Sequence, residues 1–406
     1  MSLRQLSIQW KITLLAGLCL LGIVTLLVGL SLYRMTQSSE QVKASSMQML
    51  DEAAQARIEA QGEVQALGIR RQFMDAYQYG HGFSRQVLFL REQAEKRFLD
   101  AFDTREDLTR QVKAALLANP DLLGLSLVFE ANALDAKDEL FANQAELGSN
   151  DKGRFALYWS QPTPGKLTSM ALPESDISDT RVGPSGEPAN AWFSCPRTTL
   201  KPCVIEPYFF MIDGQNVLMT SIVFPLMVNG KLIASLAVDI KLDSLQAITQ
   251  RASQQLYDGQ TQVSILSASG LLAGYSADAS KLSQRLDQVD TVNGAQVLST
   301  LAASTHIRSL RTNHQLKILA PFAPIPDGKP WGVLLDVPES VLVGPAETLK
   351  AQMDADNTRG TLLELSLGLL AAVIGLILVW LMARSVTRPI LGVAHMLEDI
   401  ASGEGD

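Results

Sequence analysis

The fold is decided by two stretches without a charged side chain, ITLLAGLCLLGIVTLLVGLSLY at residues 12–33 and LSLGLLAAVIGLILVWLMA at residues 365–383. A helix of about 20 apolar residues crosses the roughly 30 Å hydrocarbon core of a bilayer. We therefore predict two transmembrane helices, over residues 12–33 and 362–383. A cleavable signal peptide is the alternative for the first stretch, but its apolar run exceeds the usual length of about 7–15 residues. No small-residue cleavage site follows it before Arg34.

Charges on either side of these stretches predict the orientation of the chain. The two short ends hold the basic residues Arg4, Lys11, Arg384 and Arg388, whereas the acidic residues Asp354, Asp356 and Glu364 precede the second stretch. Basic residues next to a span are retained in the cytoplasm, so residues 1–11 and 384–406 are predicted to be cytoplasmic. Residues 34–361 then form a domain on the outer side of the membrane.

The composition excludes two classes of protein. The chain has 406 residues, 47% of them hydrophobic, and 34 Lys+Arg against 42 Asp+Glu give a formal net charge of −8. A disordered chain holds fewer apolar residues than this. A mildly acidic protein has no general attraction for polyanions, so nucleic acid is not expected as a partner, whereas the lipid membrane is.

The three cysteines predict one disulfide. Cys19 lies within the first span, whereas Cys195 and Cys203 bracket seven residues of the outer domain. Disulfides form outside the cytoplasm, so we expect a bond between Cys195 and Cys203. A metal site would need two more ligands, and none of the four histidines is near in sequence: His81, His306, His314 and His395.

Proline positions divide the chain into a helical part and a mixed part. All 17 prolines lie at or beyond Pro120, so the residues before it can be helical almost throughout. Apolar spacing predicts a long helix over residues 35–80, continuing the first span, and a second helix over about 84–117. Strands are predicted after Pro120, over residues 122–129, 155–159, 218–228 and 231–240, the last two joined by an Asn229-Gly230 hairpin turn.

The remainder of the outer domain repeats this arrangement on a smaller scale. Residues 162–207 hold eight prolines, from which we expect a long folded loop. A helix is predicted over residues 243–256, and further strands over 262–266, 270–275, 316–322 and 331–337. The outer domain is therefore predicted to be α+β, with a long helix carrying two antiparallel-sheet modules, at about residues 84–241 (the first module) and 258–345 (the second module).

The segment after the second span resembles the opening helix of a HAMP signal-relay module. Val386, Ile390, Val393, Leu397 and Ile400 recur at alternating spacings of four and three, as in a helical heptad. TRPI at residues 387–390 and LEDIASGEGD at 397–406 are typical of HAMP.

The full layout resembles a methyl-accepting chemotaxis receptor of the double-Cache type, as found in pseudomonads. The resemblance rests on Trp192-Phe193, EPY at 206–208, LMTSI at 218–222, AVDI at 237–240 and PWGVLLDVPE at 330–339. It implies PAS-like modules, the first distal from the membrane, in the periplasmic part of a homodimer in the bacterial inner membrane. It also implies relay of a small-molecule signal through the second span and HAMP to a chemotaxis kinase and coupling protein, by segments beyond residue 406. A HAMP-linked histidine kinase or diguanylate cyclase remains the alternative.

No catalytic motif is recognisable, and we expect neither an enzyme site nor a cofactor. The first module instead gathers aromatic residues around one acid: Tyr158, Trp159, Trp192, Phe193, Tyr208, Phe210 and Asp239. Aromatic faces and a carboxylate together can enclose a cation. The alternative is that the aromatic residues are core and that Asp239 caps the helix beginning near Leu242.

The resemblance implies ligand contacts for four of these residues, Trp192, Phe193, Tyr208 and Asp239. Related receptors for amino acids place an arginine two residues before the tryptophan, where this chain has Asn190, which we also count as a candidate ligand-binding residue. A small amine or another compact nitrogenous metabolite is therefore favoured over a free amino acid. A neutral or aromatic ligand stacked on Trp192 also remains open.

Overall fold

The computed structural model describes residues 8–312, 314–401 and 403. Arg4, Ser402 and residues 404–406, on which part of the predicted orientation and of the HAMP resemblance depends, lie outside the described residues. The chain divides into two compact units, which we call the helical unit (Met1–Ala53 with Leu342–Asp406) and the sheet unit (Ala54–Val341).

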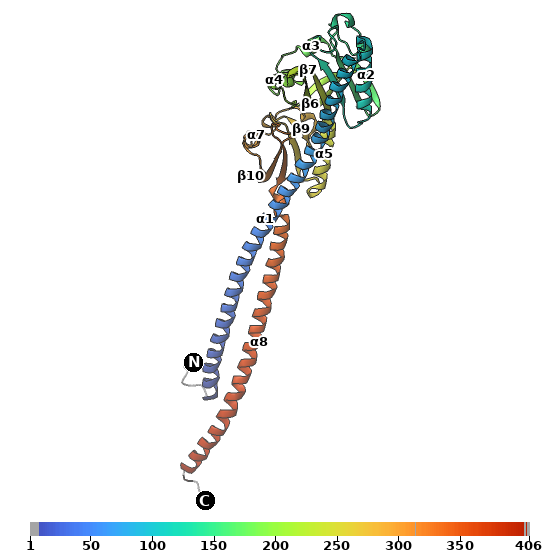
Figure 1. The fold of residues 1–406 in the computed structure, drawn as a ribbon. Coiled ribbons are helices and arrows are strands. Elements are labelled where there is room, and N and C mark those ends of the chain that lie inside the picture. The colour runs from blue at the N-terminus through green and yellow to red at the C-terminus, as the bar shows by residue number, and fades with distance from the viewer. Residues whose placement is uncertain (1–7, 313, 402, 404–406) are drawn as a thin grey trace. The chain divides into compact units, whose positions relative to one another are not determined.

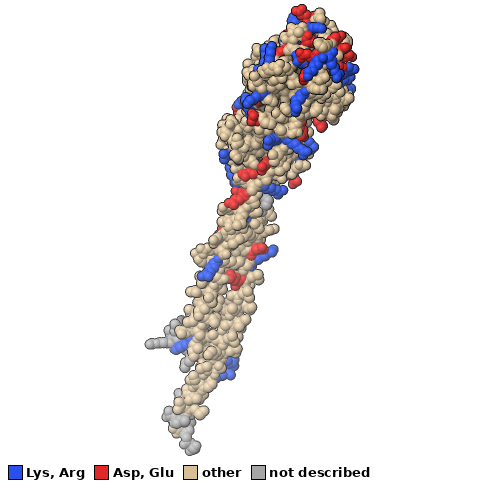
Figure 2. Space-filling model, viewed as in Figure 1, with Lys and Arg blue, Asp and Glu red and all other residues tan. Residues whose placement is uncertain are grey.

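The helical unit consists of the first part of helix α1 (Ile8–Lys96) and nearly all of helix α8 (Glu339–Ala401), which lie side by side (Figure 1). Both helices are long and apolar enough to cross a membrane. The visible face of this unit has an uncharged band over the two predicted spans (Figure 2). Glycines allow the helices to approach closely, because a Cβ atom at Gly368 would lie 2.9 Å from Val28 and one at Gly375 would lie 2.8 Å from Leu20.

Helix α1 is longer than predicted and corrects the boundaries expected from the sequence. We predicted separate helices over residues 35–80 and 84–117, but α1 is continuous to Lys96. The break falls at residues 97–100, where Phe98 has φ 53° and the Asp100 side chain caps helix α2 (Ala101–Leu117) by accepting a hydrogen bond from the Asp103 amide at 2.9 Å. Gly80 does not interrupt the helix; it lets α1 pack closely against the first sheet.

The first sheet belongs to the first module and has the strand order β3-β2-β1-β7-β6-β4, with β5 also paired to β6. Its strands are β1 (Gly124–Phe129), β2 (Ala156–Thr163), β3 (Lys166–Ala171), β4 (Cys203–Val204), β5 (Tyr208–Ile212), β6 (Gln215–Val228) and β7 (Lys231–Lys241). Neighbouring strands in this sheet are antiparallel, and Asn229 and Gly230 form the predicted tight turn with φ values of 53° and 76°. The four strands predicted in this module are confirmed.

The proline-rich segment 162–207 is not the long loop that we predicted. It contains β3, helix α3 (Glu174–Ile177), helix α4 (Ala191–Thr199) and β4. Pro173 stands at the N-cap of α3, Pro162 lies in β2, and Pro196 lies inside α4. The predicted disulfide between Cys195 and Cys203 is confirmed and ties α4 to β4.

Helix α5 (Leu242–Gln255) leads to the second sheet, which has the antiparallel order β10-β11-β12-β8-β9. Its elements are β8 (Gln262–Leu266), β9 (Leu272–Tyr275), α6 (Leu286–Val289), α7 (Gly294–Ala303), β10 (Arg308–Thr312), β11 (Gln315–Phe322) and β12 (Trp331–Pro338). Short 3-10 turns are η2 (Asp138–Phe141), η3 (Ala145–Leu147), η4 (Tyr257–Gly259) and η5 (Ala279–Lys281). Strand β10 was not predicted.

One stretch of α1 packs against both sheets (Figure 1). A Cβ atom at Gly80 would lie 2.3 Å from the Phe224 ring of β6 and 2.7 Å from Val238 of β7. Nearer the start of the helix, Phe73 meets the ring of Trp331 in β12 edge-on, with ring centroids 5.1 Å apart. The opposite face of each sheet is therefore left for α4 in the first module and for α6 and α7 in the second.

Candidate functional site

One cavity of the sheet unit gathers most of the aromatic residues singled out from the sequence. It lies on the face of the first sheet opposite α1, since Asp239 alternates along β7 with Val238, which faces that helix. The lining residues are Ser126, Tyr158, Leu172, Trp192, Tyr208, Phe210, Ala237 and Asp239. The free volume is about 10 Å³, roughly the room that one water molecule needs.

Helix α4 forms one wall of this cavity. Trp192 stands in its first turn, and the helix is anchored at its N-cap and at its middle. Asn190 at the N-cap donates from Nδ2 to the carbonyl oxygen of Ile177 at 2.8 Å, and Cys195 is bonded to Cys203. The Asn190 side chain therefore positions α4 and is not among the residues that line the cavity.

Asp239 is the acid of the cavity and is 3% exposed. Ser221 donates from Oγ to Oδ1 of Asp239 at 2.6 Å, and the Tyr208 hydroxyl lies 2.8 Å from the same Oγ. Because Ser221 gives its only proton to the carboxylate, Tyr208 is the donor to Ser221. The alternative that Asp239 caps helix α5 is wrong, since the N-cap of that helix is Lys241 and no side chain caps it.

Burial dominates the electrostatics of Asp239. Loss of solvation raises the pKa of this carboxyl group to about 6, against the interactions with the hydroxyls of Ser221 and Tyr158, which lower it. Among the described residues, no lysine or arginine contributes to that pKa or forms an ion pair with Asp239. The cavity thus holds a carboxylate whose charge no cation of the described chain neutralises.

Tyr158 and Phe210 complete the aromatic lining. Their rings meet edge-on, with centroids 5.5 Å apart. The Tyr158 hydroxyl is buried beside Asp239; the contact does not have ordinary hydrogen-bond geometry, yet it helps to lower the pKa of the carboxyl group. Burial and the nearby charge of Asp239 raise the pKa of Tyr158, so this hydroxyl keeps its proton and is directed toward Asp239 as a donor.

Besides Asn190, two further predicted site residues lie outside the cavity. Trp159 is on the opposite side of β2 from Tyr158, and the Lys113 ammonium of α2 lies 5.0 Å from its ring centroid. Phe193 is buried in the core beside Trp192, where the Arg154 guanidinium lies 5.9 Å from its ring centroid. The structure brings neither residue to the cavity.

Sequence reasoning missed the small residues of the site. Ser221 binds Asp239 directly, while Ser126, Leu172 and Ala237 leave room between the aromatic rings. Ser126 and Ala237 are cross-strand partners, and Ser221 and Asp239 are another such pair. Strand pairing was therefore the signal that could have found three of them.

A larger cleft adjoins the cavity and shares Tyr208 with it. Its volume is about 540 Å³, and residues 183–191, 205–209 and 280–284 contribute its lining. Glu187 and Glu206 both face it, and burial together with the charge of Glu206 raises the pKa of Glu187. Glu206 is already engaged, since it accepts hydrogen bonds from the Ser269 hydroxyl at 2.6 Å and the Ser269 amide at 3.1 Å.

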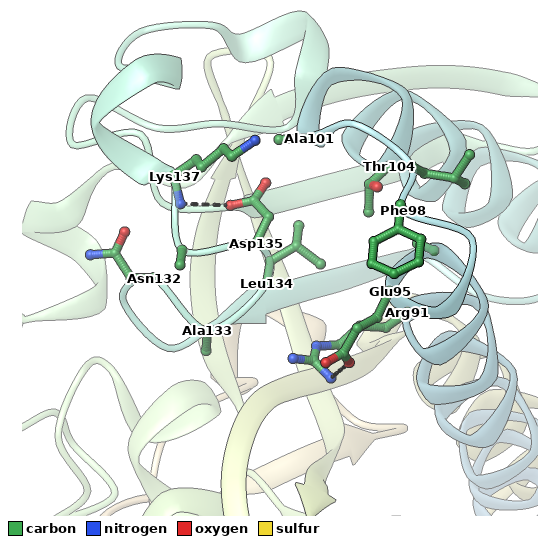
Figure 3. Close-up of a pocket in the computed structure, with 13 residues that line it drawn as sticks. Arg91, Glu95, Phe98, Ala101, Thr104, Asn132, Ala133, Leu134, Asp135 and Lys137 are labelled. Atoms are coloured by element: carbon green, nitrogen blue, oxygen red, sulfur yellow. Dashed lines mark hydrogen bonds and ion pairs between the residues drawn. The ribbon is translucent and has the colours of Figure 1, made fainter.

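A third hollow lies at the turn between α1 and α2 and has a volume of about 380 Å³ (Figure 3). The acidic groups at its wall each have a basic partner. Arg91 forms an ion pair with Glu95 at 3.5 Å, and Asp135 binds the buried Arg105 at 2.8 Å. This hollow lacks the unpaired buried charge that distinguishes the cavity around Asp239.

Comparison with known proteins gives one curated relative and a set of solved structures. The chain is 60% identical over all 406 residues to the methyl-accepting chemotaxis protein TlpQ of Pseudomonas aeruginosa, and it spans 57% of that protein's length. No protein-family model matches the chain.

The solved structures include periplasmic sensor domains. Methyl-accepting chemotaxis protein X is 23% identical with a TM-score of 0.53, over 70% of this chain and 98% of that one. The periplasmic sensory domain of the Campylobacter jejuni chemoreceptor Tlp1 is 12% identical with a TM-score of 0.52, over 71% of this chain and 95% of that one. At these identities the likeness shows the fold, and it agrees with the double-Cache arrangement predicted above.

Proposed function

Because this chain is homologous over its full length to a methyl-accepting chemotaxis receptor, we propose that it is the sensing and membrane-spanning portion of a chemoreceptor for a small amine. The ligand site is the cavity around Asp239 in the first module. The sheet unit would lie in the periplasm, with α1 and α8 crossing the bacterial inner membrane.

The observation that carries the choice of ligand is the buried, unneutralised carboxylate of Asp239. A charge removed from water is costly unless an opposite charge accompanies it. An ammonium group supplies that charge, and the rings of Trp192, Tyr158 and Phe210 can each add roughly 0.5–2 kcal/mol through their electron-rich faces. The Tyr158 hydroxyl, which lies beside Asp239, would donate a hydrogen bond to the carboxylate or accept one from the ammonium group of the same ligand.

The same geometry disfavours a free amino acid. Its carboxylate would need a cationic or strongly donating partner near Trp192. Asn190 stands two residues before Trp192, but its amide nitrogen is already bound to Ile177. A compact amine without a carboxylate requires no such partner.

Binding must enlarge the cavity, because about 10 Å³ cannot hold an organic amine. The walls that would have to move are α4, which carries Trp192, and β5, which carries Tyr208 and Phe210 and pairs with β6 alone among the described strands. Ligand binding would select the arrangement in which these walls stand apart.

The signal would leave through α8. This helix begins at Glu339, directly after β12 of the second sheet, and continues without a break to Ala401. A shift of one helix past another by an ångström or two is a known form of switching. The HAMP-like segment at its end would receive such a shift and pass it to a chemotaxis kinase and coupling protein, in a homodimer.

The test is ligand-dependent thermal unfolding of the whole chain in detergent micelles. Amines, amino acids, purines and organic acids are compared, and an amine present at 100 times its dissociation constant should add about 2.7 kcal/mol of stability. Asp239→Asn should remove that gain while the protein stays folded. Asp243→Asn is the matched control, because Asp243 is an exposed acid paired with Lys241.

Two results would contradict the proposal. Stabilisation by amines that is equal in the Asp239→Asn variant would place the ligand elsewhere. Stabilisation only by organic acids would exclude the cation site.

A further inference from the structure

Five of the seven strands in the first sheet have the same order as the five strands of the second sheet. Read from one edge, the first runs β2-β1-β7-β6-β5 and the second runs β9-β8-β12-β11-β10. Strands β1 and β7 of the first module therefore correspond to β8 and β12 of the second. Likewise β6 corresponds to β11, and β2 to β9.

The residue pairing matches within this correspondence. Asp239 is the cross-strand partner of the first residue of β1, and Asp336 is the partner of the first residue of β8. Tyr158 pairs with the third residue of β1, and Tyr275 pairs with the third residue of β8, which is a serine in both strands. Asp336 and Tyr275 thus occupy the positions of Asp239 and Tyr158.

In both sheets, the face that packs against the helices of its module carries equivalent residues. Ala237 and Val223 belong to the core under α4 in the first module. Leu334 and Leu319, at the equivalent positions, belong to the core of the second module with Leu301 of α7. The acid and the tyrosine therefore lie on the same side of the sheet in both modules.

The decisive difference is the residue beside the acid. Asp239 has Ser221 as its cross-strand partner on β6, whereas Asp336 has Lys317 on β11. Lys317 is only 2% exposed, and its ammonium group forms ion pairs with Asp336 and, at 3.3 Å, with Asp290. These charges also act on Tyr275, whose pKa is raised first by burial and then by Asp336.

We propose that the second module holds a latent cation site of the same construction as the first, and that its occupant is the ammonium group of Lys317. The inference rests on the proposed function, in which Asp239 receives an ammonium group from outside. A tethered lysine keeps the second module permanently in its occupied state. Free amines then bind the first module alone, and shortening Lys317 converts the second module into a site for a primary alkylammonium ion.

The test is chemical rescue in the whole chain, in detergent, with Asp239→Asn present in every sample to silence the first module. Lys317→Ala removes three carbons and the ammonium group, which n-propylammonium restores as a free molecule. We expect Lys317→Ala to lower the unfolding midpoint and millimolar n-propylammonium to recover most of the loss. The isosteric alcohol n-propanol should recover none, and adding Asp336→Asn should abolish the rescue.

Lys317→Met is the matched control, because methionine fills the space without a charge. It should show no response to n-propylammonium. Rescue by n-propanol, an equal response in Lys317→Met, or no response in Lys317→Ala would each overturn the proposal. If Lys317→Ala does not fold, Lys317→Ser, which copies Ser221, replaces it; failure of both to fold in n-propylammonium while Lys317→Met folds would also overturn it.

These outcomes separate the two proposals. Every sample lacks the Asp239 carboxylate, so failure of the amine site in the first module leaves the rescue unaffected. Conversely, absence of rescue would leave amine binding at Asp239 intact in the otherwise unaltered chain.

Discussion

Asp239 is suited to bind a cation, because no lysine or arginine of the described residues forms an ion pair with its carboxylate. A carboxylate in a buried strand normally pairs with a cation or stays protonated. Here only the hydroxyls of Ser221 and Tyr158 support the ionised form, and burial opposes it strongly enough to raise the pKa to about 6. The group is therefore mostly ionised at neutral pH and able to bind a cation, yet easily neutralised by mild acid.

This pKa predicts how amine binding depends on pH. In the ligand-free protein, burial raises the pKa of Asp239 to about 6. A proton therefore competes with an ammonium ligand for the ionised carboxylate. Affinity should be constant above that value and fall about tenfold for each pH unit below it. Calorimetric titration between pH 5 and pH 8 measures this, and proton release on binding at pH 6 should accompany it.

An amine affinity that is independent of pH would contradict this prediction. If amine affinity does not change between pH 8 and pH 5, Asp239 does not bind the ammonium group in its ionised form. Any affinity that remains in Asp239→Asn should show no such dependence, because that variant has no carboxyl group at this position.

Element-scale features explain why the site could be predicted only in part. Asp239 and Trp192 were recognisable as an isolated acid and a tryptophan, but Ser221 was not. The tight turn at Asn229-Gly230 sets a register that would place Thr220 opposite Asp239. A bulge on β7 near Ile233 shifts the pairing by one residue and brings Ser221 there instead. A shift of one residue reverses which face each side chain occupies. Nothing in the local sequence predicts this bulge.

Helix boundaries were misplaced for a related reason. The continuity of α1 past residue 80 depends on its packing against β6 and β7, which local propensity does not include. For residues 162–207 the error is the opposite one: the proline count predicts a loop, but the segment contains regular structure. Only the contacts of α4 with the first sheet show why a short helix forms there.

Gly80 gives a direct test of how α1 meets the first sheet. Gly80→Ala would place a Cβ atom 2.3 Å from the Phe224 ring, so it should destabilise the protein by about 1–3 kcal/mol through overpacking. Gly82→Ala is the control, because nothing lies within 4 Å of its added atom. That change should stabilise by about 0.5–1 kcal/mol, as alanine does inside a helix.

Denaturant unfolding of the two variants measures both effects. Equal changes in the free energy of unfolding, of either sign, would show that α1 does not press against β6 at Gly80.

At the scale of the whole molecule, the helical unit is the part that would carry a signal between compartments. Its helices meet through small residues, so that side chains of α1 reach the backbone of α8 at Gly368 and Gly375. The Ser31 hydroxyl and the Glu364 carboxylate are hydrogen-bonded within the same unit. Close packing of this kind allows sliding of one helix against the other while keeping them together.

Cross-linking in membranes tests this packing. In a Cys19→Ser background, Ser31→Cys with Glu364→Cys should form a disulfide readily on mild oxidation. Adding Gly368→Leu should reduce the yield severalfold, because Val28 lies 2.9 Å from the position of the added Cβ atom. Adding Gly22→Leu should leave the yield unchanged, since nothing lies within 4 Å of that site. Equal yields in all three proteins would exclude the close approach of α1 and α8 at Gly368.

The small free volume around Asp239 also affects how fast a ligand can bind. If the ligand site is the cavity around Asp239, its free volume of about 10 Å³ would admit an amine only after α4 and β5 stand apart. The association rate is then limited by that opening, and the apparent affinity is reduced by the fraction of molecules that are open. A cell carrying such a receptor would average out fluctuations of concentration that are briefer than the opening interval and respond to slower ones.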